Sequence, residues 1–116
     1  MNIQASDFYS ALSHPMRLRV VVLIIQMNEL CVCELTHTLG QAQPVISRHL
    51  SQLKETKILL ARKQGQWVYY RINDELPKWA LDVIRATLNG VLDLPPYQND
   101  RQALYTMSNR PNQACC

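Results

Sequence analysis

Apolar side chains recur along the first part of the chain at the spacing of amphipathic helices. In residues 15–26, apolar side chains lie three, four and seven positions after Leu18, the last of them being Ile25. Further valines and leucines widen this stripe. A helix that is apolar on most sides is buried, and Pro15 occupies the first turn, where proline is tolerated. The pattern predicts a central helix here, preceded by a short helix over residues 6–13.

Two further helices are predicted after it, joined by a tight turn. The first covers residues 31–39 and stops at Gly40, and the second opens at Pro44 and continues to about residue 56. Glycine is a common helix stop, and two short helices joined in this way form a helix-turn-helix. The apolar side chains of the second helix repeat at intervals of four and three and face inward. The side chains left on its outer face are Gln43, Ser47, Arg48, Ser51 and Gln52.

A change of period then predicts a β-hairpin. Residues 58–63 and 67–72 are rich in strand-forming side chains, and Gly65 between them can adopt the positive φ of a tight turn. The basic residues expected at or near its tip are Arg62, Lys63 and Arg71. A basic hairpin directly after a helix-turn-helix indicates a wing.

The chain is expected to close with one more helix and a tail. Asn73 or Asp74 can cap a helix over about residues 75–92, which ends before two prolines. Residues 1–93 are therefore expected to form one domain, α+β but mostly helical, with a two-stranded wing. The apolar faces of its first and last helices exceed what one small core needs, which favours a homodimer through them. Residues 94–116 are expected to form a mobile tail, in which residues 101–107 can form a helical turn.

Composition narrows the function without deciding it. The 116 residues are 47% hydrophobic with a net charge of +3, which permits nucleic-acid binding without demanding it. No stretch approaches the roughly 20 apolar residues of a membrane span, and the first residues lack the pattern of a secretory signal. A cytoplasmic protein with no membrane partner is expected. No nucleophile–base set, glycine-rich phosphate loop or carboxylate pair is found, so an enzyme is not expected.

The outer face of the second short helix and the hairpin together predict a DNA interface. Arginine reads guanine in the major groove, glutamine reads adenine, and a basic wing suits the phosphate backbone. His49, beside Arg48, is expected to touch either phosphate or protein. The competing interpretation is a winged-helix module that binds another protein and leaves these side chains solvated.

Four cysteines in a reducing compartment suggest reactive thiols or ligands more than disulfides. Cys31 and Cys33 are expected at a helix start, where the backbone dipole favours a thiolate, and thiolates prefer soft metals and metalloids. Residues i and i+2 point to different sides of a helix, so one ion is expected to need a distorted first turn. Alternatively, one cysteine is a small buried apolar residue. Cys115 and Cys116 are either additional ligands or simply oxidation-prone thiols.

The segments ELCVCEL, QAQPVISRHLSQLKE and LLARKQGQWVYYRI strongly resemble the arsenic-responsive ArsR/SmtB repressors over roughly residues 8–92. The resemblance implies a homodimeric winged helix-turn-helix that binds operator DNA of an arsenic-resistance operon without any cofactor. It implies release when As(III) or Sb(III) binds cysteines that match Cys31 and Cys33. The implied DNA contacts are Gln43, Ser47 and Arg48, with Arg62, Lys63 and Gln66 on the wing.

The chain departs from that family at one position. The best-known members carry a third cysteine where this chain has Thr36. Two thiols suffice for a methylated trivalent arsenical, which has two exchangeable positions; otherwise Cys115 or Cys116 must supply a third. A sensor of zinc, cadmium, lead or thiol oxidation with the same fold remains the alternative.

Overall fold

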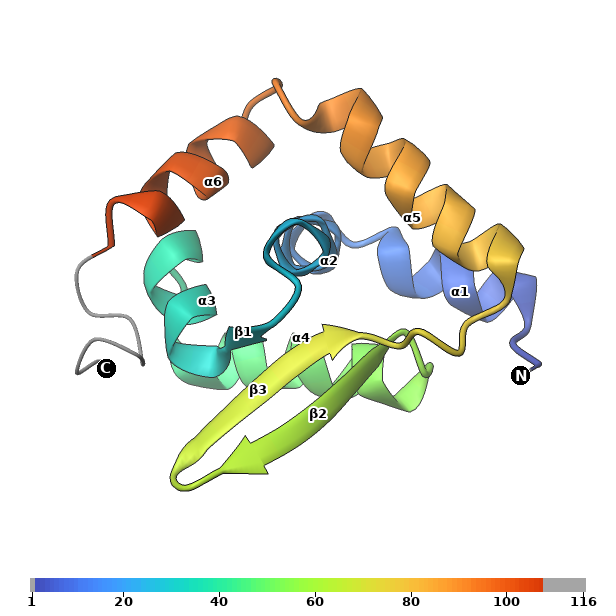
Figure 1. Ribbon diagram of the computed structural model, residues 1–116, viewed down its shortest axis with the longest axis horizontal. Coiled ribbons are helices and arrows are strands. Elements are labelled where there is room, and N and C mark those ends of the chain that lie inside the picture. Colours follow the sequence, from blue (N-terminus) through green and yellow to red (C-terminus); the bar gives the residue numbers. More distant parts are fainter. Residues whose placement is uncertain (1, 108–116) are drawn as a thin grey trace.

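The computed structural model describes residues 2–107 as a helical body with a small sheet at one side (Figure 1). The elements follow in the order α1 (Ala5–Leu12), α2 (Pro15–Met27), β1 (Leu30–Cys31), α3 (Val32–Leu39), α4 (Gln43–Glu55), β2 (Leu59–Gln64), β3 (Trp67–Ile72), α5 (Lys78–Val91) and α6 (Tyr97–Tyr105). The expected mostly helical winged helix-turn-helix is confirmed.

Helix α2 is the centre of the core. Its residues 20–24 are all buried, and it contacts α1, α4, α5, α6 and β3. Figure 1 shows it end-on, with the other helices arranged around it. An aliphatic side chain buried in this way contributes about 1.5–3 kcal/mol relative to exposure, so this helix makes a larger apolar contribution than any other single element. No single helix among residues 2–107 is long and apolar enough to cross a membrane; the pair α1 and α2 together meets that criterion but is bent by 96°.

The helix-turn-helix consists of α3 and α4. Gly40 closes α3 in the left-handed conformation, with φ of +64°, which glycine adopts without strain. Helix α4 begins at Gln43, one residue earlier than expected, with Pro44 in its first turn. Its inner side chains, Ile46, Leu50 and Leu53, are fully buried, which leaves the opposite face of α4 to solvent.

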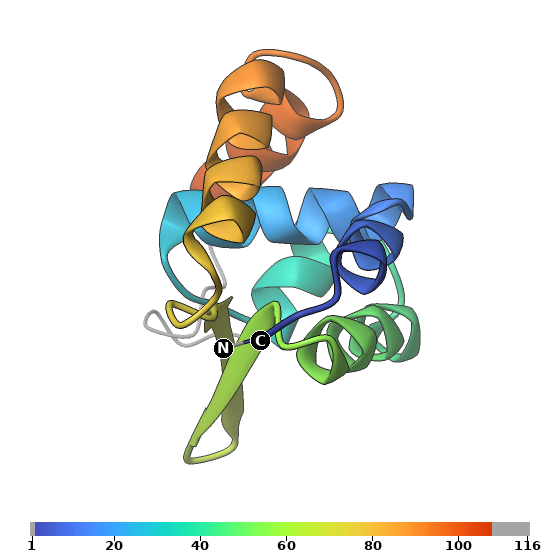
Figure 2. The same cartoon turned by 90° about the vertical axis from the view of Figure 1, so that its right-hand side faces the viewer.

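The wing projects from the body as a twisted hairpin (Figure 2). Strands β2 and β3 pair antiparallel from Leu59 opposite Ile72 to Gln64 opposite Trp67, with a two-residue loop whose Gly65 has a φ of +63°. Positive φ at the first loop residue suits a type II′ turn, which matches the twist of a hairpin. The sheet has one more strand than expected, because the two residues of β1 pair with β3 in the order β1-β3-β2.

The last helices differ from the expectation. Helix α5 begins at Lys78 after Pro77, not after Asn73 or Asp74. Asn73 instead closes the hairpin: its amide donates to the Lys57 carbonyl, and its carbonyl accepts the Glu75 N–H.

The expected mobile tail is corrected for residues 97–105, which form α6. Asp100 accepts a forked pair of hydrogen bonds from Arg19 of α2, at 2.9 and 2.7 Å, while Leu104 is fully buried. Helix α6 packs against α2 and α3 and belongs to the same core. Cys115 and Cys116 lie outside the described residues.

Candidate nucleic-acid interface and thiol site

The outer face of α4 presents polar side chains, as expected. Gln43 and Arg48 are exposed, and Ser47 is half-buried between them. Gln52 is also exposed, but its side-chain carbonyl accepts a 2.6 Å hydrogen bond from Arg17 Nη1. Arg17 is held in turn by the Ala11 carbonyl at 2.7 Å. This end of the α4 face is therefore oriented by the junction of α1 and α2.

His49 lies on the inner side of this face. Its ring is half-buried, 4.5 Å from the ring of His14, and its Nδ1 is a buried atom with no hydrogen-bond partner among the described residues. Burial, and next the positive charge of His14, Arg17 and Arg48, lower the pKa of His49. The imidazole is therefore disfavoured as a charged partner for phosphate.

The basic side chains of the wing lie at different distances from the tip of the hairpin. Lys63 and Gln66 are exposed at the tip, on either side of Gly65. Arg71 was expected near the tip, but it pairs with Leu60 close to the base of the hairpin, because β3 continues antiparallel away from the turn. Arg71 instead lines a cavity between α2 and α5 with Asn28 and Arg85.

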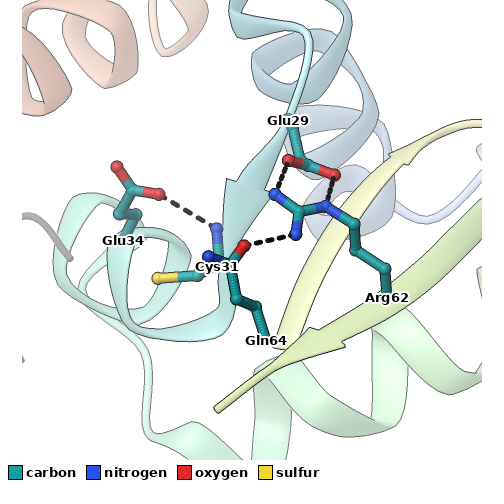
Figure 3. A network of polar contacts seen from close by, with 5 residues as sticks. All are labelled: Glu29, Cys31, Glu34, Arg62 and Gln64. Carbon is teal, nitrogen blue, oxygen red and sulfur yellow. Dashed lines mark hydrogen bonds and ion pairs between the residues drawn. The ribbon is translucent and has the colours of Figure 1, made fainter. Parts of the chain in front are cut away.

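Arg62 is held by other side chains of the protein (Figure 3). Its guanidinium donates to both carboxylate oxygens of Glu29, at 2.8 and 2.6 Å, and to the side-chain carbonyl of Gln64 at 2.6 Å. It also lies 4.6 Å from the centre of the Tyr69 ring, within the range of a cation–π contact. The Arg62 hydrogen bond holds the pKa of Glu29 below its usual value.

The sulfur atoms of Cys31 and Cys33 lie 3.1 Å apart. Cys31 is the N-cap of α3, in extended conformation at φ −92° and ψ 165°, and Cys33 is the second residue of the helix. The expectation that α3 must be distorted to bring the sulfurs together is therefore wrong. Because Cys31 lies outside the helical spiral, its side chain can turn toward Cys33.

The Cys31 thiol is not activated by the helix start. Its neighbour Glu34 forms a capping box with it, in which the Glu34 carboxylate accepts the Cys31 N–H at 3.0 Å (Figure 3). Cys31 is 1% exposed, and burial raises the pKa of its thiol to about 11. The expectation of a stabilised thiolate fails because desolvation outweighs the helix dipole. The spacing Cys31-x-x-Glu34 is that of a capping box, a signal the sequence analysis missed.

The cysteine pair opens into a cavity of about 320 Å³ between α3 and the wing. Its lining comes from the end of β1, the first part of α3, the first residue of α4 and the wing near its turn. These residues are Cys31, Val32, Cys33, Thr36, Gln43, Gln66, Trp67 and Val68. A group bound to the two sulfurs would therefore lie in the same cavity as Gln43 of α4 and Gln66 of the wing.

Two sulfurs are what the described residues offer to a metal or metalloid at this site. Residues 2–107 contain no cluster of three histidine, cysteine or acidic side chains placed to hold a metal ion. Thr36, at the position of the third cysteine, donates its hydroxyl to the Cys33 carbonyl at 3.0 Å. The donor set suits a soft centre with two exchangeable positions.

Known proteins with similar sequences share this architecture. The model of the bacterial regulatory proteins of the arsR family matches residues 14–59. The chain is 42% identical to the arsenic resistance transcriptional regulator ArsR2 of Pseudomonas putida, over 98% of this chain and 99% of that protein. The chain belongs to the ArsR family of bacterial regulatory proteins.

Other members of the ArsR family agree with this assignment. The arsenical resistance operon repressor of Escherichia coli is 47% identical over 67% of each chain. Among solved structures, HlyU from Vibrio cholerae matches with a TM-score of 0.68 and 25% identity, over 75% of this chain and 90% of that one. Regulators of the ArsR fold bind double-stranded DNA, and the family consists of transcriptional regulators, not enzymes.

Proposed function

We propose that this ArsR-family protein is a repressor whose apo dimer binds the operator of an arsenic-resistance operon and releases it when a trivalent arsenical or antimonite binds Cys31 and Cys33. One observation carries the proposal: two sulfurs 3.1 Å apart share a cavity with the first residue of α4 and with the wing tip. Such a protein works in the cytoplasm, where its thiols stay reduced and DNA is accessible.

DNA contacts are assigned to α4 and to the tip of the wing. Arg48 is the exposed arginine on α4 and suits a guanine edge, with Gln43, Ser47 and Gln52 as polar contacts on the same face. Lys63 and Gln66 at the tip suit the adjacent backbone. His49 supports α4 from the inner side through its contact with His14.

The spacing of the sulfurs favours a trivalent pyramidal centre over tetrahedral zinc. Two sulfurs at about 2.3 Å from one centre lie about 3.3 Å apart when the bond angle is near 90°, and about 3.8 Å apart at a tetrahedral angle. The pair lies 3.1 Å apart without further movement. Zinc, cadmium or lead would also need three or four ligands, and the described residues bring together two.

A third thiolate for inorganic As(III) is assigned to Cys115 or Cys116. Helix α6 returns the chain to α3, so the stretch that leads to Cys115 starts at Met107, not at Pro95. Eight residues reach at most about 28 Å when fully extended, which favours delivery within the same protomer. Deleting residues 114–116 should weaken the response to arsenite and leave the response to a methylated trivalent arsenical intact. Unchanged responses to both would make the tail cysteines bystanders.

The dimer is assigned to α1 and α5. Tyr9 and Trp79, from these two helices, are 52% and 39% exposed and stack with ring centres 6.3 Å apart. Aromatic side chains exposed on adjacent helices are typical of interface cores. A dimer would present two α4 helices about one turn of DNA apart.

A titration of the reduced, full-length protein on operator DNA tests the proposal. Fluorescence anisotropy is followed with arsenite, methylarsenite, antimonite, Zn(II), Cd(II) and hydrogen peroxide in separate arms. Release by the trivalent arsenicals and antimonite, without release by the other arms, is the expected result. Release by zinc, cadmium or peroxide alone would assign the site to the alternative sensor classes, and an absence of operator binding would favour a protein-interaction module.

A further inference from the structure

The ion pair between Glu29 and Arg62, called the strap below, crosses the sheet beside the cysteine pair. Glu29 directly precedes β1, and Arg62 lies within β2, although β1 and β2 are not neighbours in the order β1-β3-β2. The two side chains meet through a forked contact at 2.8 and 2.6 Å, with the guanidinium over the ring of Tyr69 on β3. The strap therefore joins all three strands at one level.

That level is the one that contains Cys31. Tyr69 is paired with Cys31 on one side and with Arg62 on the other. The third arm of the guanidinium reaches Gln64, the last residue of β2 before the wing turn, at 2.6 Å (Figure 3). A single side chain thus connects the strand that bears the buried thiol to the tip of the wing.

We infer that Arg62 is a positioning residue that couples the Cys31–Cys33 pair to the wing through Glu29 and Gln64, and does not bind phosphate. Its Nε, Nη1 and Nη2 each already donate to an acceptor of the protein. These contacts fix the guanidinium between Glu29 and Gln64, and the Glu29 carboxylate offsets its charge, whereas the exposed neighbour Lys63, on the opposite face of the strand, is the better-placed cation for a phosphate.

The strap gives inducer binding a route to the DNA interface. Cys31 is 1% exposed, so a centre can reach its sulfur only if β1 shifts, and Glu29 moves with β1 because it adjoins the strand. A forked arginine–carboxylate contact is directional, so this movement reorients Arg62 and, through Gln64, the wing tip. This inference rests on the proposed function, because it supplies the link between its two sites.

Variants of the strap separate coupling from phosphate binding. Glu29→Gln and Arg62→Gln are compared with Lys63→Gln as the matched control on the adjacent residue. The first readout is the slope of log affinity against log salt, which falls by about one when a phosphate contact is lost. The second is the phenylarsine oxide concentration that releases half of the operator. The third is the change in tryptophan emission on adding phenylarsine oxide, which reports binding at the cavity because Trp67 lines it and Trp79 does not.

The expected pattern is the same for both strap variants. Glu29→Gln and Arg62→Gln keep the wild-type salt slope and the wild-type Trp67 midpoint, yet need at least fivefold more phenylarsine oxide for release. Lys63→Gln loses about one unit of slope per protomer and releases normally. The charge-swapped Glu29→Arg/Arg62→Glu protein recovers release at lower arsenical, which loss of a phosphate contact would not allow.

Two results would overturn the inference. If Arg62→Gln loses a unit of salt slope per protomer and Glu29→Gln loses none, Arg62 is a phosphate contact. Release of both strap variants at the wild-type concentration would remove the strap from the coupling. A wild-type protein that binds phenylarsine oxide, as read by Trp67, and stays on the operator would instead overturn the proposed function itself.

Discussion

Single residues account for the closeness of the two sulfurs. Cys31 is extended while Val32 begins α3, and this one change of backbone conformation lets side chains at i and i+2 converge to 3.1 Å. Glu34 holds the junction by accepting the Cys31 N–H. The site is therefore preorganised for one bound centre, at the cost of a buried thiol whose pKa is raised to about 11.

Arg48 is expected to be the main base-reading residue. Replacing it by alanine should weaken specific operator binding by about 1–3 kcal/mol, because a bidentate contact to a base edge is lost. Lys78→Ala, an exposed cation on α5, should have no such effect. Equal operator affinity for the Arg48 variant and the wild type in an anisotropy titration would remove Arg48 from the interface.

His49 should make stability depend on pH below neutrality. Its pKa is lowered in the folded state by burial and by nearby positive groups, so below its ordinary value of 6.5 the unfolded chain binds the proton more readily. Stability is then lost as the pH falls through this window. His49→Gln should flatten the decrease in melting temperature between pH 7.5 and 5.5. A variant with the wild-type pH dependence would contradict this assignment.

At the scale of elements, α6 distinguishes this chain from a minimal winged helix. Its anchor is the pair Arg19–Asp100 at 2.7 Å, with Asp100 3% exposed, together with the buried Leu104. The same contact distance occurs between Lys78 and Asp82 on the exposed face of α5. The two pairs therefore differ in burial and in geometry, because Arg19 makes a forked contact and Lys78 a single one.

Asp100→Ala should lower the free energy of unfolding by about 1.5–3 kcal/mol, because it removes a forked, charge-assisted contact from a buried position. Asp82→Ala is the matched control and should change it by less than about 0.5 kcal/mol, as expected for an exposed pair. Chemical denaturation measures both. Similar losses for the two variants would show that the α6 anchor adds no more than a surface contact.

Elements with a strong local pattern were predictable, and those held by distant contacts were not. The apolar stripes of α2 and α4 and the Gly65 hairpin follow from residue spacing alone. Strand β1 has two residues, too few for an alternating pattern, and its pairing depends on β3 some forty positions later. Helix α6 buries few side chains, and its partner Arg19 is 81 residues away in the sequence.

The candidate site was predictable in its residues but not in its geometry. The sequence singled out both cysteines and the outer face of α4. The cavity that joins them to Gln43 and Trp67 depends on the placement of the wing beside α3 and α4. The engagement of Arg62 by Glu29 likewise depends on the three-stranded sheet.

At the scale of the whole molecule, the proposed repressor needs two copies of the chain. Leu88 is half-buried on α5, the helix assigned to the dimer. Leu88→Asp should give a monomer with weakened operator binding, because a charge is unfavourable in an apolar interface. Tyr105→Asp, at a 62% exposed position on α6, should remain dimeric. Analytical ultracentrifugation measures the oligomeric state of each protein. A wild-type protein that is monomeric at micromolar concentration would contradict the proposed dimer.

The most direct test of the account is release of operator DNA by the cysteine pair. Wild-type, Cys31→Ser and Cys33→Ser proteins are titrated onto labelled operator, and methylarsenite is then added while anisotropy is recorded. Serine is nearly isosteric and is a favourable N-cap, so both variants should bind DNA as the wild type does. A hydroxyl is a poor ligand for a soft centre, so neither variant should release it. Release of either variant at the wild-type methylarsenite concentration would contradict the account.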